Sequence, residues 1–272
     1  MRQGMAFDIG FIGAGNMATA LARGVIRAGV AEPGRVCASD VSPERRAGFV
    51  KATGAVGLES NVEAVESSEM VVIAVKPQMV DEVLGEVGKR FVRSQVVVSI
   101  AAGIGTGHIE LFCGEPVGVV RVMPNTPALV GEGMTAIAPG RYATKEQLER
   151  VRGLFEAVGQ VVEVEEGQME AVTAVSGSGP AYFFYMMECL AGGAIAEGLS
   201  PEVAWQLTRQ TAVGAAVLAD ESEETVEELR RRVTSPGGTT EAAIGVMNEA
   251  GFRGIVQKAV QTAAKRAREL GR

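Results

Sequence analysis

The chain has 272 residues and a formal net charge of -7 at pH 7, with basic and acidic residues interspersed. This acidic balance argues against a surface that binds nucleic acid or an anionic membrane. A chain of this length can bury a large core without covalent cross-links, so Cys37, Cys113 and Cys189 are interpreted as small buried hydrophobes in a reducing compartment.

The first residues already limit where the protein resides. Asp8 and a glycine-rich turn leave no room for a signal peptide, and the apolar stretch at 171–187 is interrupted by serine, glycine and proline. We therefore expect a cytoplasmic protein that does not span a membrane.

Residues 1–163 alternate short β-branched runs with helical patterns, which is typical of strand–helix–strand units around a parallel sheet. Continuous apolar runs such as residues 70–75 indicate strands that are covered on both faces. The predicted strands are 7–12, 35–39, 69–75, 95–100, 118–122, 135–138 and 160–164, and the predicted helices are 17–28, 43–52, 79–90 and 145–158.

A Gly-x-Gly-x-x-Ala pattern lies between the first predicted strand and the first predicted helix. Gly13 permits a tight turn, Gly15 lets backbone amides approach a pyrophosphate, and Ala18 packs the helix close to the sheet. The N-terminus of that helix then faces the phosphates. The pattern predicts a dinucleotide site that includes Gly13, Ala14, Gly15, Asn16 and Met17.

The second predicted strand ends where a dinucleotide enzyme meets the adenosine ribose. Asp40 would accept hydrogen bonds from ribose hydroxyls and repel a 2′-phosphate, whereas Ser39 with Arg45 or Arg46 would hold that phosphate. A third interpretation is that Asp40 only caps the helix that begins at Pro43. The choice of cofactor stays open at this point.

Val75-Lys76-Pro77 follows the strand predicted at 69–75, at the edge on which open α/β sheets bind ligands. Lys76 either contacts a phosphate or is a solvated residue before the next helix. His108, the one histidine, begins a predicted helix and is interpreted as a structural or surface residue. One histidine and three scattered cysteines predict no metal site.

After Glu166 no strand pattern follows, and alanine-rich helical patterns continue to the end of the chain. Gly179-Pro180 and Ser200-Pro201 mark helix starts, because proline fits the first helical position. The predicted organisation is α/β: a Rossmann-type parallel sheet domain at 1–163, then an all-helical domain at 164–272.

Three segments are too rich in Gly, Ser, Thr and Pro to be core, namely 121–127, 174–180 and 233–240. Each can present backbone N–H groups and hydroxyls, and the last two precede helices, where a carboxylate could bind. Three tight interhelical turns would have the same composition, so composition alone leaves both interpretations open.

The segments 173–182 and 233–240 together resemble the double signature of the pyrroline-5-carboxylate reductases. Segments 9–18, 74–77, 99–103 and 122–130 are also similar to that family, in the family's order, so the resemblance covers essentially the whole chain.

The resemblance implies a Rossmann domain followed by a helical dimerisation domain, with an active site shared between two subunits. It implies hydride transfer from NADPH, or from NADH, to the C=N bond of the small molecule 1-pyrroline-5-carboxylate, which gives L-proline. The implied partner is a second copy of the chain, bound through the helical domain, or a higher assembly of such dimers.

The resemblance also assigns residues. It implies Thr240 as the catalytic residue, in a loop that cradles the substrate carboxylate. The expected substrate-binding residues are Asn125, Ser176, Ser235, Gly238, Thr239 and Thr240. Ser39 and Asp40 are expected to bind the cofactor from their position after the second strand, and the further expected cofactor-binding residues are Asn61, Ala74, Val75, Lys76, Pro77, Ala101, Ala102 and Gly103.

Two other functions fit the sequence less well. A β-hydroxyacid dehydrogenase would need a lysine base on the helical domain, but no lysine occurs between Lys145 and Lys258. A dinucleotide-sensing regulatory protein would keep the glycine-rich turn without needing three polar loops outside it. Reduction of a protonated C=N bond fits better, because it needs orientation more than acid–base groups.

Overall fold

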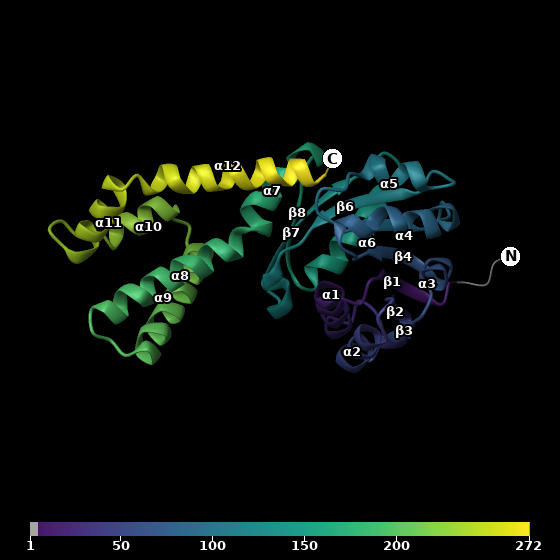
Figure 1. Cartoon of the computed structure of the whole chain (residues 1–272), viewed down its shortest axis with the longest axis horizontal. Helices are drawn as coiled ribbons and strands as arrows, with labels where there is room; N and C mark the ends of the chain where they lie inside the picture. Colours follow the sequence, from purple (N-terminus) through teal and green to yellow (C-terminus); the bar gives the residue numbers. More distant parts are fainter. Residues whose placement is uncertain (1–4, 272) are drawn as a thin grey trace. The chain divides into compact units, whose positions relative to one another are not determined.

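The computed structural model describes residues 5–271, which divide into two compact units (Figure 1). Unit 1 comprises Met1–Ser178 together with Ala263–Arg272, and unit 2 comprises Gly179–Thr262. The end of the chain thus folds with the first unit. The domain boundary expected between residues 163 and 164 follows the last strand and stays a prediction.

Unit 1 is built on one sheet with the strand order β3-β2-β1-β4-β5-β6-β7-β8. The chain runs outward from β1 to β3 and then returns to place β4 beside β1. The order therefore reverses between β1 and β4, where open α/β sheets bind their ligands. The strands are β1 Phe7–Ile12, β2 Val36–Ser39, β3 Val56–Leu58, β4 Ser68–Ile73, β5 Val96–Ser99, β6 Gly118–Met123, β7 Gly133–Pro139 and β8 Gly159–Glu163.

Both faces of the sheet are covered by helices. Ile9 and Phe11 of β1 belong to one apolar cluster with residues of α1 and α6, whereas Ile12 belongs to another with residues of α4 and α5. Alternate residues of a strand point to opposite faces, so two cores form. The helices are α1 Asn16–Arg27, α2 Pro43–Thr53, α3 Asn61–Ser67, α4 Val80–Val87, α5 Thr106–Phe112 and α6 Lys145–Glu156. The predicted Rossmann-type domain is confirmed.

Three features of unit 1 differ from expectation. Strand β7 is antiparallel to β6, because the segment between them is too short for the crossover that parallel strands need. Strand β3 and helix α3 were not predicted at all. β3 contains only Val56, Gly57 and Leu58, which is too short to give a periodic pattern.

Five helices follow in the C-terminal region. They are α8 Gly179–Ala196, α9 Pro201–Glu221, α10 Val226–Arg232, α11 Thr239–Glu249 and α12 Phe252–Leu270. The starts predicted at Gly179 and Pro201 are confirmed, and in Figure 1 α8 and α9 lie side by side. Within residues 5–271, no helix is long and apolar enough to cross a membrane.

The cysteines only partly match expectation. Cys37 is buried, and burial raises the pKa of its thiol to about 11. Cys113 is half-buried, but Cys189 is exposed on α8, so its interpretation as a buried hydrophobe is wrong for the single chain. His108 lies at the surface, 2.6 Å from Asp81, as a structural residue would.

Candidate functional site

The glycine-rich turn lies between β1 and α1, against the ends of two other strands. Gly13 has a φ of 101°, and a Cβ there would lie 2.8 Å from the carbonyl oxygen of Ala74. Its backbone N–H donates to the carbonyl of Ser39 over 2.7 Å. Only glycine fits this position, because a side chain meets both an unfavourable backbone angle and a neighbouring backbone atom.

Gly15 has the opposite surroundings. Among the described residues, no heavy atom lies within 4 Å of the position where its Cβ would be. Gly15 is also the N-cap of α1, and no side chain caps this helix end. The first N–H groups of α1 therefore face open space, which fits a pyrophosphate group.

Asp40 folds back onto the same turn. Its carboxylate accepts a hydrogen bond from the backbone N–H of Ala14 and another from Ser42, each over 2.9 Å. The N-cap of α2 is Ser42, whose hydroxyl accepts from the N–H of Arg45. The interpretation of Asp40 as the cap of that helix is therefore wrong.

Ser39 and Asn61 meet beside this carboxylate. The Ser39 hydroxyl donates to the side-chain oxygen of Asn61 over 2.8 Å, and Asn61 donates to Glu86 over 2.8 Å. Asn61 is the first residue of α3, so the unpredicted helix brings it to the end of β2. The structure thus gathers three expected cofactor residues, Ser39, Asp40 and Asn61, around the glycine-rich turn.

The remaining expected cofactor residues follow β4 and β5. The N–H of Ala74 donates to the carbonyl of Ile12 over 2.8 Å, which places the segment of Ala74, Val75, Lys76 and Pro77 beside the turn. Lys76 is exposed, and no ion pair of the described residues includes it, so both interpretations of this lysine remain open. Ala101, Ala102 and Gly103 follow β5 at the same edge.

The end of the chain closes one side of that edge. A Cβ on Gly103 would lie 2.9 Å from the Cα of Gly271, so the two backbones are in direct contact. Neither glycine tolerates a side chain there without movement. The position of the C-terminal residues beside this expected cofactor segment was not predicted from the sequence.

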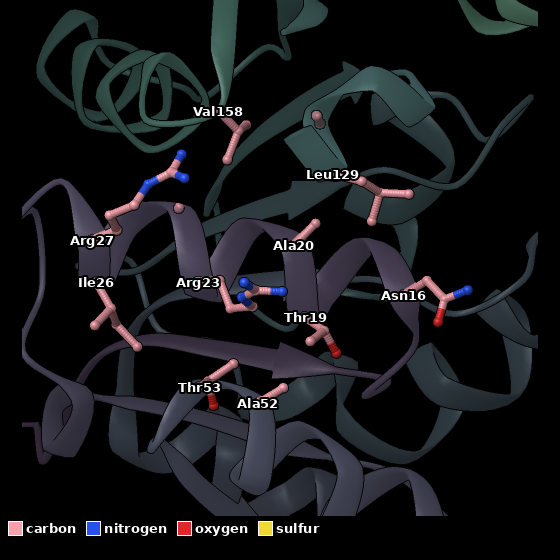
Figure 2. Close-up of a pocket in the computed structure, with 12 residues that line it drawn as sticks. Asn16, Thr19, Ala20, Arg23, Ile26, Arg27, Ala52, Thr53, Leu129 and Val158 are labelled. Carbon is pink, nitrogen blue, oxygen red and sulfur yellow. The ribbon is translucent and has the colours of Figure 1, made fainter. Parts of the chain in front are cut away.

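A cavity of about 340 Å³ runs along α1 (Figure 2). It is lined by Asn16, Thr19, Arg23 and Arg27 of α1, and by residues of α2 and of the segment after β6. Asn16 is the one expected site residue that it includes. The cavity is therefore a neighbour of the turn and does not coincide with the expected dinucleotide site.

Asn125 and Ser176 are joined in unit 1. The Asn125 amide donates to the hydroxyl of Ser176 over 3.2 Å and to its carbonyl over 3.3 Å, and its oxygen accepts from the N–H of Met134 over 2.9 Å. Asn125 thereby fixes the loop after β6 to the segment that contains Ser176.

That segment is helical and is not an open turn. Thr173–Gly177 forms a π-helical turn between α7, Met169–Val172, and α8. The N–H of Ser178 donates to the carbonyl of Thr173 over 2.8 Å, so the backbone is satisfied internally. The interpretation of 174–180 as a tight turn is wrong, because Thr173–Gly177 is helical and α8 begins at Gly179, whereas a role of this segment in binding stays a prediction. Such extra-residue turns recur at functional sites.

The sequence did not reveal an ion cluster around the buried side chain of Arg121. Arg121 of β6 lies 3.0 Å from Glu170 and 3.9 Å from Glu166, and Glu166 also accepts from the N–H and hydroxyl of Thr106 over 2.6 and 2.7 Å. It anchors α7 and the preceding turn to the sheet. The available signal was an arginine inside the apolar run of β6.

The segment 233–240 is a turn in unit 2 that ends at the start of α11. Gly238 is the N-cap, and Thr239 and Thr240 are the first two residues of the helix. No hydrogen bond of the described chain uses the N–H of either threonine. The interpretation of Thr240 as the helix cap is therefore wrong.

The same turn contains a carboxylate of the chain itself. The N–H of Gly237 donates to Glu241 over 2.7 Å, and the N–H of Gly238 donates to the carbonyl of Ser235 over 3.0 Å. The loop thus brings Ser235, Gly238, Thr239 and Thr240 together, as expected. N–H groups without a partner at the positive end of a helix dipole are chemically suited to an anion such as a carboxylate.

The acidic and sulfur-containing residues form no evident metal site. Among residues 5–271, no group of three or more His, Cys, Asp or Glu side chains is arranged to hold an ion.

Two family models match the chain. The model for pyrroline-5-carboxylate reductase dimerisation matches residues 166–270, and the model for NADP oxidoreductase, coenzyme F420-dependent, matches residues 8–103.

Similar proteins extend the match to almost the full length. The pyrroline-5-carboxylate reductase of Pseudomonas aeruginosa is 44% identical over 96% of this chain and 96% of its own, and that of Arabidopsis thaliana is 40% identical over 97% and 96%. A solved pyrroline-5-carboxylate reductase from Coxiella burnetii has a TM-score of 0.91 at 38% identity, covering 98% of this chain and 99% of that one. The Plasmodium falciparum enzyme, solved with NADP bound, has a TM-score of 0.88 at 30% identity, covering 99% and 100%.

Proposed function

The chain belongs to the pyrroline-5-carboxylate reductase family, and from this membership we infer that it transfers a hydride from NAD(P)H to the C=N bond of 1-pyrroline-5-carboxylate and releases L-proline. The observation that carries this inference is the similarity to these reductases over nearly the whole chain. The function places the protein at the last step of proline biosynthesis.

The cofactor binds in unit 1, at the edge where the strand order reverses. Gly13, Ala14, Gly15, Asn16 and Met17 hold the pyrophosphate at the start of α1, which the open space at Gly15 supports. The adenosine end meets Ser39, Asp40 and Asn61. The rest of the cofactor is lined by Ala74, Val75, Lys76, Pro77, Ala101, Ala102 and Gly103.

The substrate carboxylate binds at the start of α11. The N–H groups of Thr239 and Thr240 and the Thr240 hydroxyl donate to it, and Ser235 and Gly238 shape the turn. Asn125 and Ser176 belong to the substrate site as well. Because their polar groups are bonded to each other and to Met134, they act by holding the loop after β6 in place.

The reaction adds a hydride to carbon and leaves a secondary amine. NAD(P)H supplies the hydride, and the imine nitrogen carries a proton that makes the carbon electrophilic. The protein then has to orient the ring, exclude water and balance the carboxylate charge. Thr240 is the catalytic residue in this scheme, since its hydroxyl contacts the substrate and fixes its orientation.

The protein functions as a homodimer, or as a higher assembly of such dimers, in the cytoplasm. The match to a dimerisation family model at 166–270 supports the association. Large apolar side chains of α8 and α9 also lie exposed in the single chain, among them Phe183, Phe184, Tyr185, Val213 and Val217. A second copy of unit 2 would cover such a surface.

An absorbance assay tests the proposed reaction. Purified protein with 1-pyrroline-5-carboxylate should oxidise NADH or NADPH and form one proline per cofactor consumed. The six-membered piperideine carboxylate serves as the comparison substrate. Absence of proline with both cofactors would contradict the proposal.

A further inference from the structure

We propose that this enzyme uses NADH in preference to NADPH and that Asp40 determines the choice. The inference rests on the proposed function and refines its cofactor. NADH and NADPH differ only in the 2′-phosphate on the adenosine ribose, so the groups at the end of β2 decide between them. Four side chains of the sequence compete for that role: Ser39, Asp40, Arg45 and Arg46.

Hydrogen bonds hold the Asp40 carboxylate beside the glycine-rich turn. The N–H groups of Ala14 and Ser42 each donate to a different carboxylate oxygen over 2.9 Å. The side chain is only 6% exposed, so it has little freedom to move away from an incoming phosphate. A carboxylate offers about four acceptor positions, which leaves two for the ribose hydroxyls of NADH.

Two of the three groups that would bind a 2′-phosphate are already occupied. The fully buried Ser39 hydroxyl donates to Asn61 over 2.8 Å. Arg46 donates to the backbone carbonyl of Asp40 over 2.7 Å and lies 3.2 Å from Glu59, and its side chain is only 16% exposed. Neither group can turn to a phosphate without breaking these bonds.

Arg45 remains as the one exposed cation of the four. Its side chain is 63% exposed, and one of its terminal nitrogens lies 3.8 Å from the Asp40 carboxylate. Its charge therefore offsets that of Asp40, which leaves little net positive potential for a phosphate of charge about -2. The balance of fixed groups favours the uncharged ribose hydroxyls of NADH.

The test compares the two cofactors in the full-length protein. The ratio of kcat/KM for NADH to that for NADPH, at fixed 1-pyrroline-5-carboxylate, should be about tenfold or more for the wild type. Asp40→Asn keeps the shape and one acceptor oxygen but removes the charge. This substitution should lower the ratio at least about fivefold, chiefly by raising kcat/KM for NADPH.

A second variant tests the role of Arg45, and a third serves as the control. Arg45→Gln should lower kcat/KM for NADPH further and change kcat/KM for NADH little, because only the 2′-phosphate of NADPH interacts with the cation. Glu115→Gln removes one exposed negative charge before β6, at the opposite edge of the sheet, and should leave the ratio unchanged. If Asp40→Asn disturbs the glycine-rich turn, kcat/KM should fall for NADH and NADPH alike. The ratio of the two values would then stay the same.

Calorimetric affinities for NADH and NADPH without substrate separate this inference from the proposed reaction. If neither cofactor supports turnover, the reaction is wrong, and the affinity ratio still decides the cofactor. A wild-type ratio below about threefold in favour of NADH, by turnover or by affinity, overturns the inference. An Asp40→Asn protein that keeps the wild-type ratio overturns the role of Asp40.

Discussion

Gly13 and Gly15 lie in one turn, yet the fold itself requires glycine only at Gly13. Gly13 has a left-handed backbone and packs against the carbonyl of Ala74. Gly15 has neither restriction, because the space beside it is open among the described residues. A side chain at Gly13 would disturb the fold, whereas one at Gly15 would disturb only what binds in that space.

The two glycines therefore provide a matched pair of variants. Gly15→Val should lose cofactor affinity in calorimetry while its Tm stays near that of the wild type. Gly13→Ala should lower the free energy of unfolding by roughly 1–3 kcal/mol, because it forces a strained backbone angle and a close contact. Unchanged cofactor affinity in Gly15→Val would contradict the assignment of the turn.

Thr240→Ala tests the carboxylate site. A hydrogen bond to a charged group is worth roughly 1.5–3 kcal/mol, so kcat/KM for the imine should fall about ten- to a hundredfold. Cofactor affinity should stay nearly constant, because the proposed cofactor residues all lie in unit 1.

Thr240→Ser is the matched control, because it keeps the hydroxyl and should retain most of the activity. Since the N-cap of α11 is Gly238, loss of the Thr240 side chain should also leave the Tm almost unchanged. An alanine variant with wild-type kcat/KM would move the carboxylate site elsewhere.

The sequence predicted which residues form the site better than it predicted which residues contact each other. The glycine pattern and the turn before α11 could be recognised because their spacing is local. The contact of Asp40 with Ala14 spans 26 residues, and that of Arg121 with Glu170 spans 49. No local pattern contains such pairs, since the fold creates them by bringing together segments that are far apart along the chain.

Among the elements, long and strongly patterned ones were predictable, and short ones were not. Helix α1 and strand β4 matched closely, because burial on one face gives a helical period and burial on both faces gives a continuous apolar run. Strand β3 is held by its pairing with β2, and β7 takes its direction from a short connection. The π-helical turn at Thr173–Gly177 was hidden by glycine and serine, which the tertiary packing keeps helical.

Helix α10 begins with a capping box that should depend on pH. Thr225 donates to Glu228 from its hydroxyl over 2.7 Å and from its N–H over 2.9 Å, and these bonds lower the pKa of the Glu228 carboxyl below its ordinary value of 4.5. A lowered pKa in the folded state adds stability above the unfolded pKa, and the gain is lost as pH falls through the folded pKa.

Glu228→Gln keeps the shape of the box without its charge. Its Tm should be lower than that of the wild type at pH 7, and the difference should shrink toward zero below pH 4.5. Helix α6 begins with the same box built from Thr144 and the uncharged Gln147. The Tm deficit of Gln147→Ala should therefore be independent of pH over this range. A pH-independent deficit in Glu228→Gln would contradict the assignment.

At the scale of the whole molecule, the exposed apolar surface of unit 2 predicts association. Phe184 of α8 is 58% exposed in the single chain, and a charge introduced there should be costly once a second copy covers it. Sedimentation at micromolar concentration should show a dimer or a multiple of it for the wild type. Phe184→Asp should shift the protein toward monomers.

Leu111→Asp provides the matched control, because Leu111 is an apolar residue of unit 1 that is 83% exposed. It should leave the sedimentation profile unchanged. A wild-type protein that sediments as a single active monomer would refute the proposed dimer.

Residues 263–272 return to unit 1, which affects how the two units can be separated by proteolysis or exchanged in evolution. Residues 179–262 are an insertion within the fold of unit 1, so two separate crossings of the backbone join the units. A single proteolytic nick at either crossing would leave the halves covalently linked. A gene shortened after residue 178 would lack Ala264 and Ala267, both buried, and the backbone contact at Gly103. Transfer of the helical unit between relatives therefore requires exchange of the internal segment 179–262, while the last turns of α12 stay with unit 1.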